Sequence, residues 1–102
     1  MNTSTGQTNY YNLLSVDGSY NPLTATTFTV TTIRDGAIYT GMTVNVNLVD
    51  YQLGVYTAQW SASTIGNYQM FFQSSANNQI IASDVVHVLP DYAFTNTFYL
   101  GI

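Results

Sequence analysis

The alternation of hydrophobic and polar positions predicts a chain of short β-strands. Within residues 54–60 the aromatic and small apolar side chains fall on every second position, and the same period of two returns within residues 66–73. A period of two places one set of side chains on each face of a strand. Tyr68 follows Gly66 by two residues, after a connection that would cross between two sheets. This is the position of a tyrosine corner, in which the ring is packed and the hydroxyl bonds back to the backbone.

Further strands are predicted on either side, separated by turn signals. Residues 24–33 are rich in β-branched side chains, residues 42–49 alternate Val or Leu with Asn, and residues 80–89 form an apolar strand that ends at Pro90. Gly, Asn, Asp and Pro mark turns near residues 17–22, 34–36, 40–41 and 77–78. The pattern predicts about six or seven strands in a mostly antiparallel β-sandwich, with a β-barrel as the second interpretation.

The chain has the length of one domain with a single two-layer core. We predict that residues 24–90 form the sandwich, that residues 1–23 are an N-terminal arm or edge segment, and that residues 91–102 are an apolar C-terminal tail, edge strand or arm. The predicted core consists of apolar side chains expected to point inward from the strands: Phe28, Val30, Val44, Val46, Tyr56, Trp60, Tyr68, Met70 and Phe72.

Charged side chains make up only 6% of the sequence, with Arg34 as the only Lys or Arg and five Asp as the only acids. The surface of a soluble protein usually carries about a quarter to a third charged residues. This surface is therefore expected to consist mainly of Thr, Ser, Asn, Gln and Tyr, which suits burial against neighbouring subunits or stacking on sugars. A single Arg cannot neutralise enough phosphates for nucleic-acid binding, so we expect no nucleic-acid partner.

Cysteine is absent from the sequence, which excludes disulfides, thiolate nucleophiles and Cys-based zinc sites. Residues 1–8 have neither the basic start nor the apolar run of a signal peptide. The apolar runs are far shorter than the roughly 18–20 residues that cross a bilayer. We expect neither an export signal nor a membrane segment.

Residues for catalysis are scarce. A Ser or Thr nucleophile needs an adjacent base, and the one candidate, His87, would face outward if Val86 and Val88 point inward. The Asp residues are scattered, several of them at turn positions, without the close spacing of a calcium loop or a carboxylate pair for glycoside hydrolysis. Gly-rich phosphate loops are absent as well. We expect no enzymatic activity, no metal and no cofactor.

Residues 54–72, together with residues 80–89, resemble the second half of a filamin-type immunoglobulin-like repeat. Similar Gly-x-Tyr patterns occur in the immunoglobulin-like domains of tailed-phage virion proteins. The best-matched positions are Gly54, Tyr56, Trp60, Gly66 and Tyr68. The resemblance covers roughly residues 27–90 and implies an all-β, immunoglobulin-like antiparallel β-sandwich of about seven strands. Because such sandwiches host many functions, the fold alone implies no activity.

The resemblance and the composition together lead us to expect a virion structural protein. The expected role is a decoration or cement protein on the capsid surface of a tailed phage, where it would contact the major capsid protein, copies of itself, or both. An alternative is a tail or fibre module that binds a host receptor or surface glycans, and a third is a cellular adhesion repeat. The expected partner interface gathers aromatic and apolar residues outside the core: Tyr10, Tyr11, Leu13, Leu14, Phe71, Tyr92, Phe94, Phe98, Tyr99 and Leu100.

Overall fold

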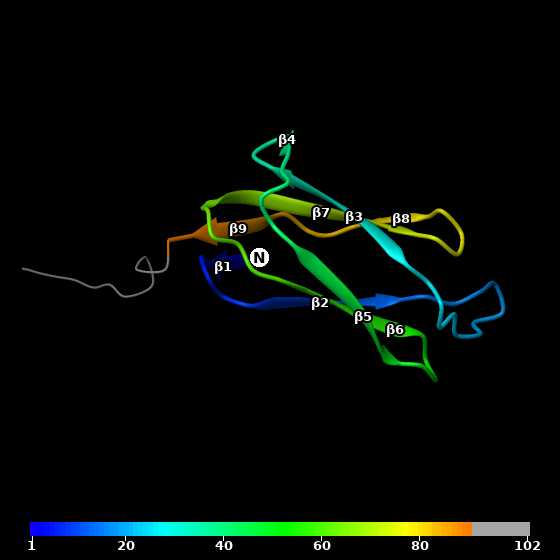
Figure 1. Cartoon of the computed structure of the whole chain (residues 1–102). Coiled ribbons are helices and arrows are strands. Elements are labelled where there is room, and N and C mark those ends of the chain that lie inside the picture. The colour runs from blue at the N-terminus through cyan, green and yellow to red at the C-terminus, as the bar shows by residue number, and fades with distance from the viewer. Residues whose placement is uncertain (91–102) are drawn as a thin grey trace, which may run out of the picture.

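The computed structural model describes residues 1–90, which form a two-layered β-sandwich without helices (Figure 1). The described residues contain nine strands: β1 (Asn2–Ser4), β2 (Asn9–Leu14), β3 (Phe28–Arg34), β4 (Ala37–Ile38), β5 (Val44–Asp50), β6 (Val55–Trp60), β7 (Gly66–Ser74), β8 (Ile80–Ala82) and β9 (Val86–Leu89). The all-β prediction is confirmed. The barrel interpretation is wrong, because the strands form two separate sheets.

The order of the strands is that of an immunoglobulin-like sandwich. Sheet A has the order β1-β9-β7-β3-β4, with β8 also paired to β7, and sheet B has the order β2-β6-β5. The pairs are antiparallel except β1 with β9, which is parallel. In immunoglobulin nomenclature β2, β6 and β5 take the places of strands B, E and D, and β3, β7 and β9 those of C, F and G.

The N-terminal segment forms one edge strand in each sheet. β1 is the edge of sheet A beside β9, where the backbone N–H of Thr5 donates to the carbonyl oxygen of Leu89 at 3.0 Å. β2 is the edge of sheet B beside β6. Of the two alternatives that the sequence left open, the described residues adopt the edge segment, and the sandwich begins at Asn2 rather than at residue 24.

The strand predicted over residues 80–89 is interrupted. Residues 83–85 separate β8 from β9, although both strands pair with β7. At the break, the backbone N–H of Ser83 donates to the carbonyl oxygen of Met70, and the Ser83 hydroxyl accepts from the backbone N–H of Met70. The serine hydroxyl thus replaces one backbone acceptor of the strand ladder, and residues 83–85 leave the regular strand at this point.

The core lies between the sheets and is built around aromatic rings. Trp60 of β6 is 2% exposed, and Tyr68 of β7 is 0% exposed with its ring centroid 6.4 Å from that of Trp60. Full burial of a large apolar side chain contributes about 1.5–3 kcal/mol. Among the predicted core residues, those of β6 and β7 are buried: Tyr56, Trp60, Tyr68, Met70 and Phe72. Those of β3 and β5 pack against them half-buried: Phe28, Val30, Val44 and Val46.

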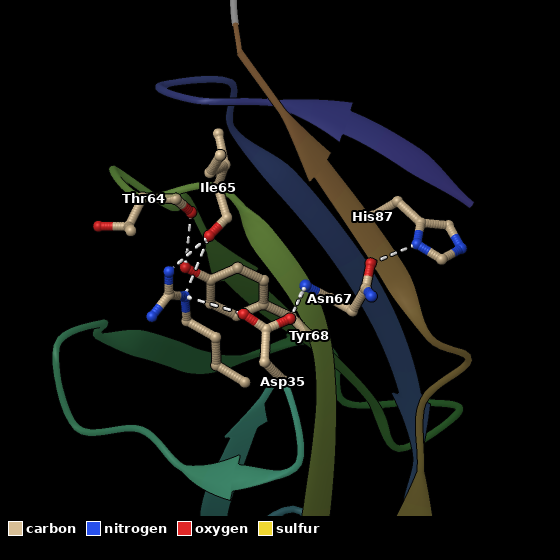
Figure 2. Close-up of polar contacts among 7 residues, drawn as sticks. Asp35, Thr64, Ile65, Asn67, Tyr68 and His87 are labelled. Carbon is tan, nitrogen blue, oxygen red and sulfur yellow. Dashed lines mark hydrogen bonds and ion pairs between the residues drawn. The ribbon is translucent and has the colours of Figure 1, made fainter.

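A tyrosine corner joins β6 to β7, as the sequence predicts. The Tyr68 hydroxyl donates to the carbonyl oxygen of Thr64 at 2.7 Å (Figure 2). The hydroxyl of a second tyrosine, Tyr56, also bonds to the backbone of an irregular connection. The Tyr56 hydroxyl donates to the carbonyl oxygen of Leu23 at 2.7 Å and accepts from the backbone N–H of Thr26 at 3.1 Å. The two phenols thereby tie two irregular connections to the core.

Replacing Tyr68 with phenylalanine is expected to lower the free energy of unfolding by about 0.5–1.5 kcal/mol, the net contribution of one hydrogen bond. The ring stays in place, so only the bond to Thr64 is lost. Tyr10→Phe is the matched control, because Tyr10 is exposed, and it is expected to change stability by less than about 0.5 kcal/mol. Urea unfolding followed by circular dichroism measures both. Equal midpoints for the two variants would show that the corner hydroxyl adds nothing.

Candidate protein–protein interface

Arg34, the one Lys or Arg of the chain, is used to hold the fold together. Arg34 donates from Nε and Nη2 to the carbonyl oxygen of Ile65, at 3.1 and 2.7 Å. Its guanidinium carbon lies 5.4 Å from the centroid of the Tyr39 ring, and its Nε lies 3.9 Å from a carboxylate oxygen of Asp35. Arg34 therefore holds the connection before β7 in place, and it is not a free cation for a phosphate.

The polar groups around the start of β7 are also structural. The Asp35 carboxylate accepts the backbone N–H of Asn67 at 2.9 Å, and the Asn67 side chain contacts Nδ1 of His87 across the β7–β9 pair (Figure 2). His87 is exposed, whereas Val86 and Val88 on either side are buried, so the imidazole faces outward as expected. Within residues 1–90 its hydrogen-bond partner is an amide, and no hydroxyl nucleophile bonds to it.

Two of the acidic side chains, Asp17 and Asp50, stabilise turns. The Asp17 carboxylate accepts the backbone N–H groups of Asn21 and Ser19 at 2.9 and 2.8 Å, and these bonds lower its pKa below the ordinary value. Asp50 accepts two backbone N–H groups of the β5–β6 turn in the same way. No group of three His, Cys, Asp or Glu side chains in the described part of the chain could hold a metal ion. None of the described residues belongs to a helix of the length and apolarity needed to cross a membrane.

The outer surface of sheet B, called the B face below, carries two uncharged rows of side chains that cross its three strands. The strand registers place Tyr10 opposite Gln59 and Asn45 in one row. The next row is Asn12, Thr57 and Asn47, in which the Thr57 hydroxyl donates to the Asn12 side-chain oxygen at 3.2 Å. These rows offer amide donors and acceptors and a phenol, without a single charge.

One end of the B face is apolar, and we call it the apolar end. It is formed where β2 and β5 finish and the β5–β6 turn begins, with Leu14 beside Val55 in the strand register. Asp50 completes this row, and its carboxylate bonds to the backbone of the turn. Its exposed members are Leu14 (57%), Val49 (60%), Leu53 (62%) and Tyr51 (67%). Gathered apolar side chains on a surface mark interaction sites, whereas single ones need no explanation. Of these four residues, only Leu14 is assigned to the interface from the sequence alone. The position of Val55 next to the inward-facing Tyr56 could have indicated an apolar residue on the outer face.

The other expected interface residues lie in different places. Tyr10 is exposed on the B face. Phe71 is half-buried on the outer surface of sheet A, between Thr31 of β3 and Ala82 of β8. The structure therefore does not bring Phe71 together with the β2 residues. The expected C-terminal interface residues lie outside the described residues: Tyr92, Phe94, Phe98, Tyr99 and Leu100.

The structure corrects the assignment of Leu13 to the partner interface. Leu13 is 5% exposed and belongs to the core. The register of β2 on β6 sets Leu13 opposite Tyr56 and Tyr11 opposite Ala58, so the odd-numbered residues of β2 point inward with their partners. Tyr11 is half-buried, with its ring centroid 6.1 Å from that of Trp60. Tyr11 thus belongs mainly to the interior, and Tyr10 and Leu14 remain as surface residues.

An opening runs along the free edge of β2. A pocket of about 250 Å³ lies there, lined on one side by Tyr11 and Leu13 and on the other by Phe72, Ile81 and Ser83. Met1 and Asp84 also line it. Burial raises the pKa of the Tyr11 phenol above its ordinary value. Among the described residues neither the Tyr11 hydroxyl nor the buried indole N–H of Trp60 has a hydrogen-bond partner.

Comparison of the chain with protein-family models, with curated proteins and with solved structures found no match. Function is therefore inferred from the chemistry and shape of this chain alone.

Proposed function

We propose that this protein is a non-enzymatic structural component of a virion, a decoration or cement protein that stabilises a tailed-phage capsid by bridging its subunits. The observation that carries the proposal is the B face, which combines uncharged polar rows with an apolar end in a chain that is only 6% charged. Covering such a surface removes few charges from water, which suits lasting contact with neighbouring protein.

The proposed mechanism is mechanical. The aromatic core and the two tyrosine hydroxyl bonds make the sandwich a stiff spacer. Covering the apolar end would contribute on the order of 25 cal/mol per Å² of apolar surface, before the cost of ordering the contact. A small gain at each contact adds up when the contact repeats over a shell. The partners would be the major capsid protein, further copies of this chain, or both.

A second candidate function is a tail or fibre module that binds a host receptor or a glycan. The observation in its favour is the pair of polar rows on the B face, because amide side chains can both donate to and accept from sugar hydroxyls. The exposed ring of Tyr10 at the end of one row offers a surface on which a sugar could stack.

The test compares purified particles that contain the protein with particles from which it has been removed. The cement role requires copies on the order of hundreds per particle, as symmetric shells repeat each contact, and earlier genome release on heating when the protein is absent. Adding the purified protein back should restore the release temperature. A copy number of only a few dozen or fewer, together with unchanged heat resistance, would overturn the cement role and favour the tail module.

The apolar end gives this test a sharper form. Protein that carries Leu14→Asp with Leu53→Asp is expected to fold but not to rebind stripped particles, because two carboxylates would have to be desolvated in the contact. Ile38→Asp with Ile80→Asp is the matched control, since it adds the same two charges at exposed positions (74% and 61%) on β4 and β8 of sheet A. If both proteins rebind alike, the apolar end is not the contact.

A further inference from the structure

The free edge of β2 is an acceptor for another strand. β2 pairs with β6 on one side, and within residues 1–90 no strand lies on its other side. Natural sheet edges are usually protected by Lys, Pro, inward charges or bulges. β2 has the sequence Asn-Tyr-Tyr-Asn-Leu-Leu, which contains none of these residues, and it pairs with β6 without a register shift. Its backbone groups are therefore available for β-augmentation.

Beside this edge lie an open pocket, an exposed apolar side chain and a hydroxyl that is unpaired within residues 1–90, all of which an added strand could cover. The pocket of about 250 Å³ opens between β2 and β8, and Ile81 on its far wall is 43% exposed although it sits opposite buried Phe72 in the register. The Tyr11 hydroxyl in the same wall has no hydrogen-bond partner among the described residues. An added strand could cover Ile81 with an apolar side chain and accept a hydrogen bond from the Tyr11 hydroxyl with a backbone carbonyl.

The sequence contains a segment with the matching pattern outside the described residues. In residues 91–102 five of the six even-numbered positions carry large apolar side chains, with Asn96 as the exception: Tyr92, Phe94, Phe98, Leu100 and Ile102. The odd-numbered positions carry smaller or more polar side chains, including Thr95 and Thr97, except for the aromatic Tyr99. Strands rise about 3.3 Å per residue, so half of this segment can run along the six residues of β2.

We propose that residues 91–102 of one copy of the chain add as a strand to the β2 edge of a second copy. The apolar positions enter the pocket between β2 and β8, and the threonines face outward in line with Asn12. The donor segment and the acceptor edge are different surfaces of the chain, so each contact is heterologous; it closes into a reciprocal dimer or a larger ring, or it propagates as a filament. This assembly mode stands independently of the virion proposal.

A second copy fits better than the chain's own tail. β9 ends at Leu89, beside Ser4 at the end of β1. The turn that leads from β1 to β2 passes between this point and the start of β2, with Thr5 bonded to Leu89 and Gly6 bonded to Ala62. β9 ends at the end of the sandwich where β2 starts (Figure 1), so a strand donated by the same chain would have to pass this turn and reverse, whereas a strand from a neighbour would not.

The first experiment measures assembly by sedimentation of the full chain over a range of concentrations. Phe94→Asp with Phe98→Asp places charges at apolar positions and is expected to abolish the oligomers, leaving monomer. Thr95→Asp with Thr97→Asp adds the same charges at the alternate positions and is expected to leave the oligomers in place. Equal behaviour of the two variants, or a wild-type chain that is monomeric at every concentration, would overturn the proposal.

The second experiment identifies the acceptor edge by disulfide crosslinking, which the absence of native Cys makes clean. A chain with Thr97→Cys is mixed with a chain with Asn12→Cys on β2, or with Asn47→Cys on β5. Asn12 and Asn47 flank Thr57 from opposite sides, so they are matched outward positions on the two edges of sheet B. The Asn12 pair is expected to crosslink about tenfold faster, because binding raises the local thiol concentration. Faster crosslinking to Asn47, or no difference, would assign the tail to another site.

Failure here and failure of the virion proposal give different results. If particles that lack the protein are less stable to heat, but the Phe94→Asp, Phe98→Asp chain sediments like the wild type, the cement role is kept and strand addition is rejected. If the oligomers depend on residues 91–102 but the protein is absent from particles, strand addition is kept and the cement role is rejected.

Discussion

Replacing Trp60 with alanine is expected to lower the free energy of unfolding by about 3–5 kcal/mol, the usual effect of removing a large aromatic side chain from a core. Domains of this size are stable by only about 5–15 kcal/mol, so the variant would lose a large part of its stability. Trp60 lies at the centre of the sandwich, 2% exposed, with its ring 6.1 Å from Tyr11 of the same sheet and 6.4 Å from Tyr68 of the opposite one.

The effect should come from lost packing and not from a lost hydrogen bond. The indole N–H has no hydrogen-bond partner among the described residues, so its removal leaves no acceptor unsatisfied. Trp60→Phe, which keeps most of the ring volume, is therefore expected to destabilise clearly less than Trp60→Ala. Tyr51→Ala is the surface control, because Tyr51 is exposed, and its effect should stay within about 0.5 kcal/mol.

Circular dichroism during urea unfolding is the suitable measurement, since Trp60 is the only tryptophan and its fluorescence disappears with it. A loss below about 1 kcal/mol for Trp60→Ala would mean that the sheets collapse into the space, and that the aromatic centre is not what fixes their separation.

Sequence periodicity was sufficient where one parity of a strand is apolar and the other polar. β6 and β7 meet this condition, and the tyrosine corner between them could be recognised from Gly66 and Tyr68 before any coordinates. The condition fails in β2, where Tyr10-Tyr11 and Leu13-Leu14 put apolar residues on both parities. Only the register on β6 decides which of each pair points inward, and this placed Leu13 in the core.

Two other features depend on contacts between distant residues. The break between β8 and β9 lies where Ser83 bonds twice to the backbone of Met70. The apolar pattern of residues 80–89 does not predict this break. The Tyr56 hydroxyl holds Leu23 and Thr26, some thirty residues earlier in the chain. Local patterns cannot show such a bond. For the candidate interface, composition indicated an uncharged surface, but its location on the B face follows from the strand registers alone.

Gly54→Ala is expected to be the most damaging glycine substitution in the described residues, with a loss of about 2–5 kcal/mol from strain and overpacking together. Gly54 has a φ of +72°, which disfavours any side chain. A Cβ at this position would also collide with the carbonyl oxygen of Ser15 and lie 3.2 Å from Cα of Pro22. Both are backbone atoms, so the collision cannot be relieved by a side-chain rotation.

Two other glycines separate these contributions. Gly36 has a φ of +85° but open space around its Cβ position, so Gly36→Ala should show the backbone strain alone, about 1–2 kcal/mol. Gly18 has neither a positive φ nor a close neighbour, and Gly18→Ala should be neutral or slightly stabilising. The expected order of urea midpoints is Gly18→Ala above Gly36→Ala above Gly54→Ala.

The difference between Gly54→Ala and Gly36→Ala then measures how firmly β2 is held at the apolar end. Gly54 accepts the backbone N–H of Ser15 at 2.8 Å, which fixes the chain just after Leu14 against the β5–β6 turn. If this contact is rigid, the two variants differ by 1 kcal/mol or more, on the order of an overpacked site. Equal midpoints would show that the end of β2 can move away from the turn, and the apolar end would then lack the fixed shape that a docking surface needs.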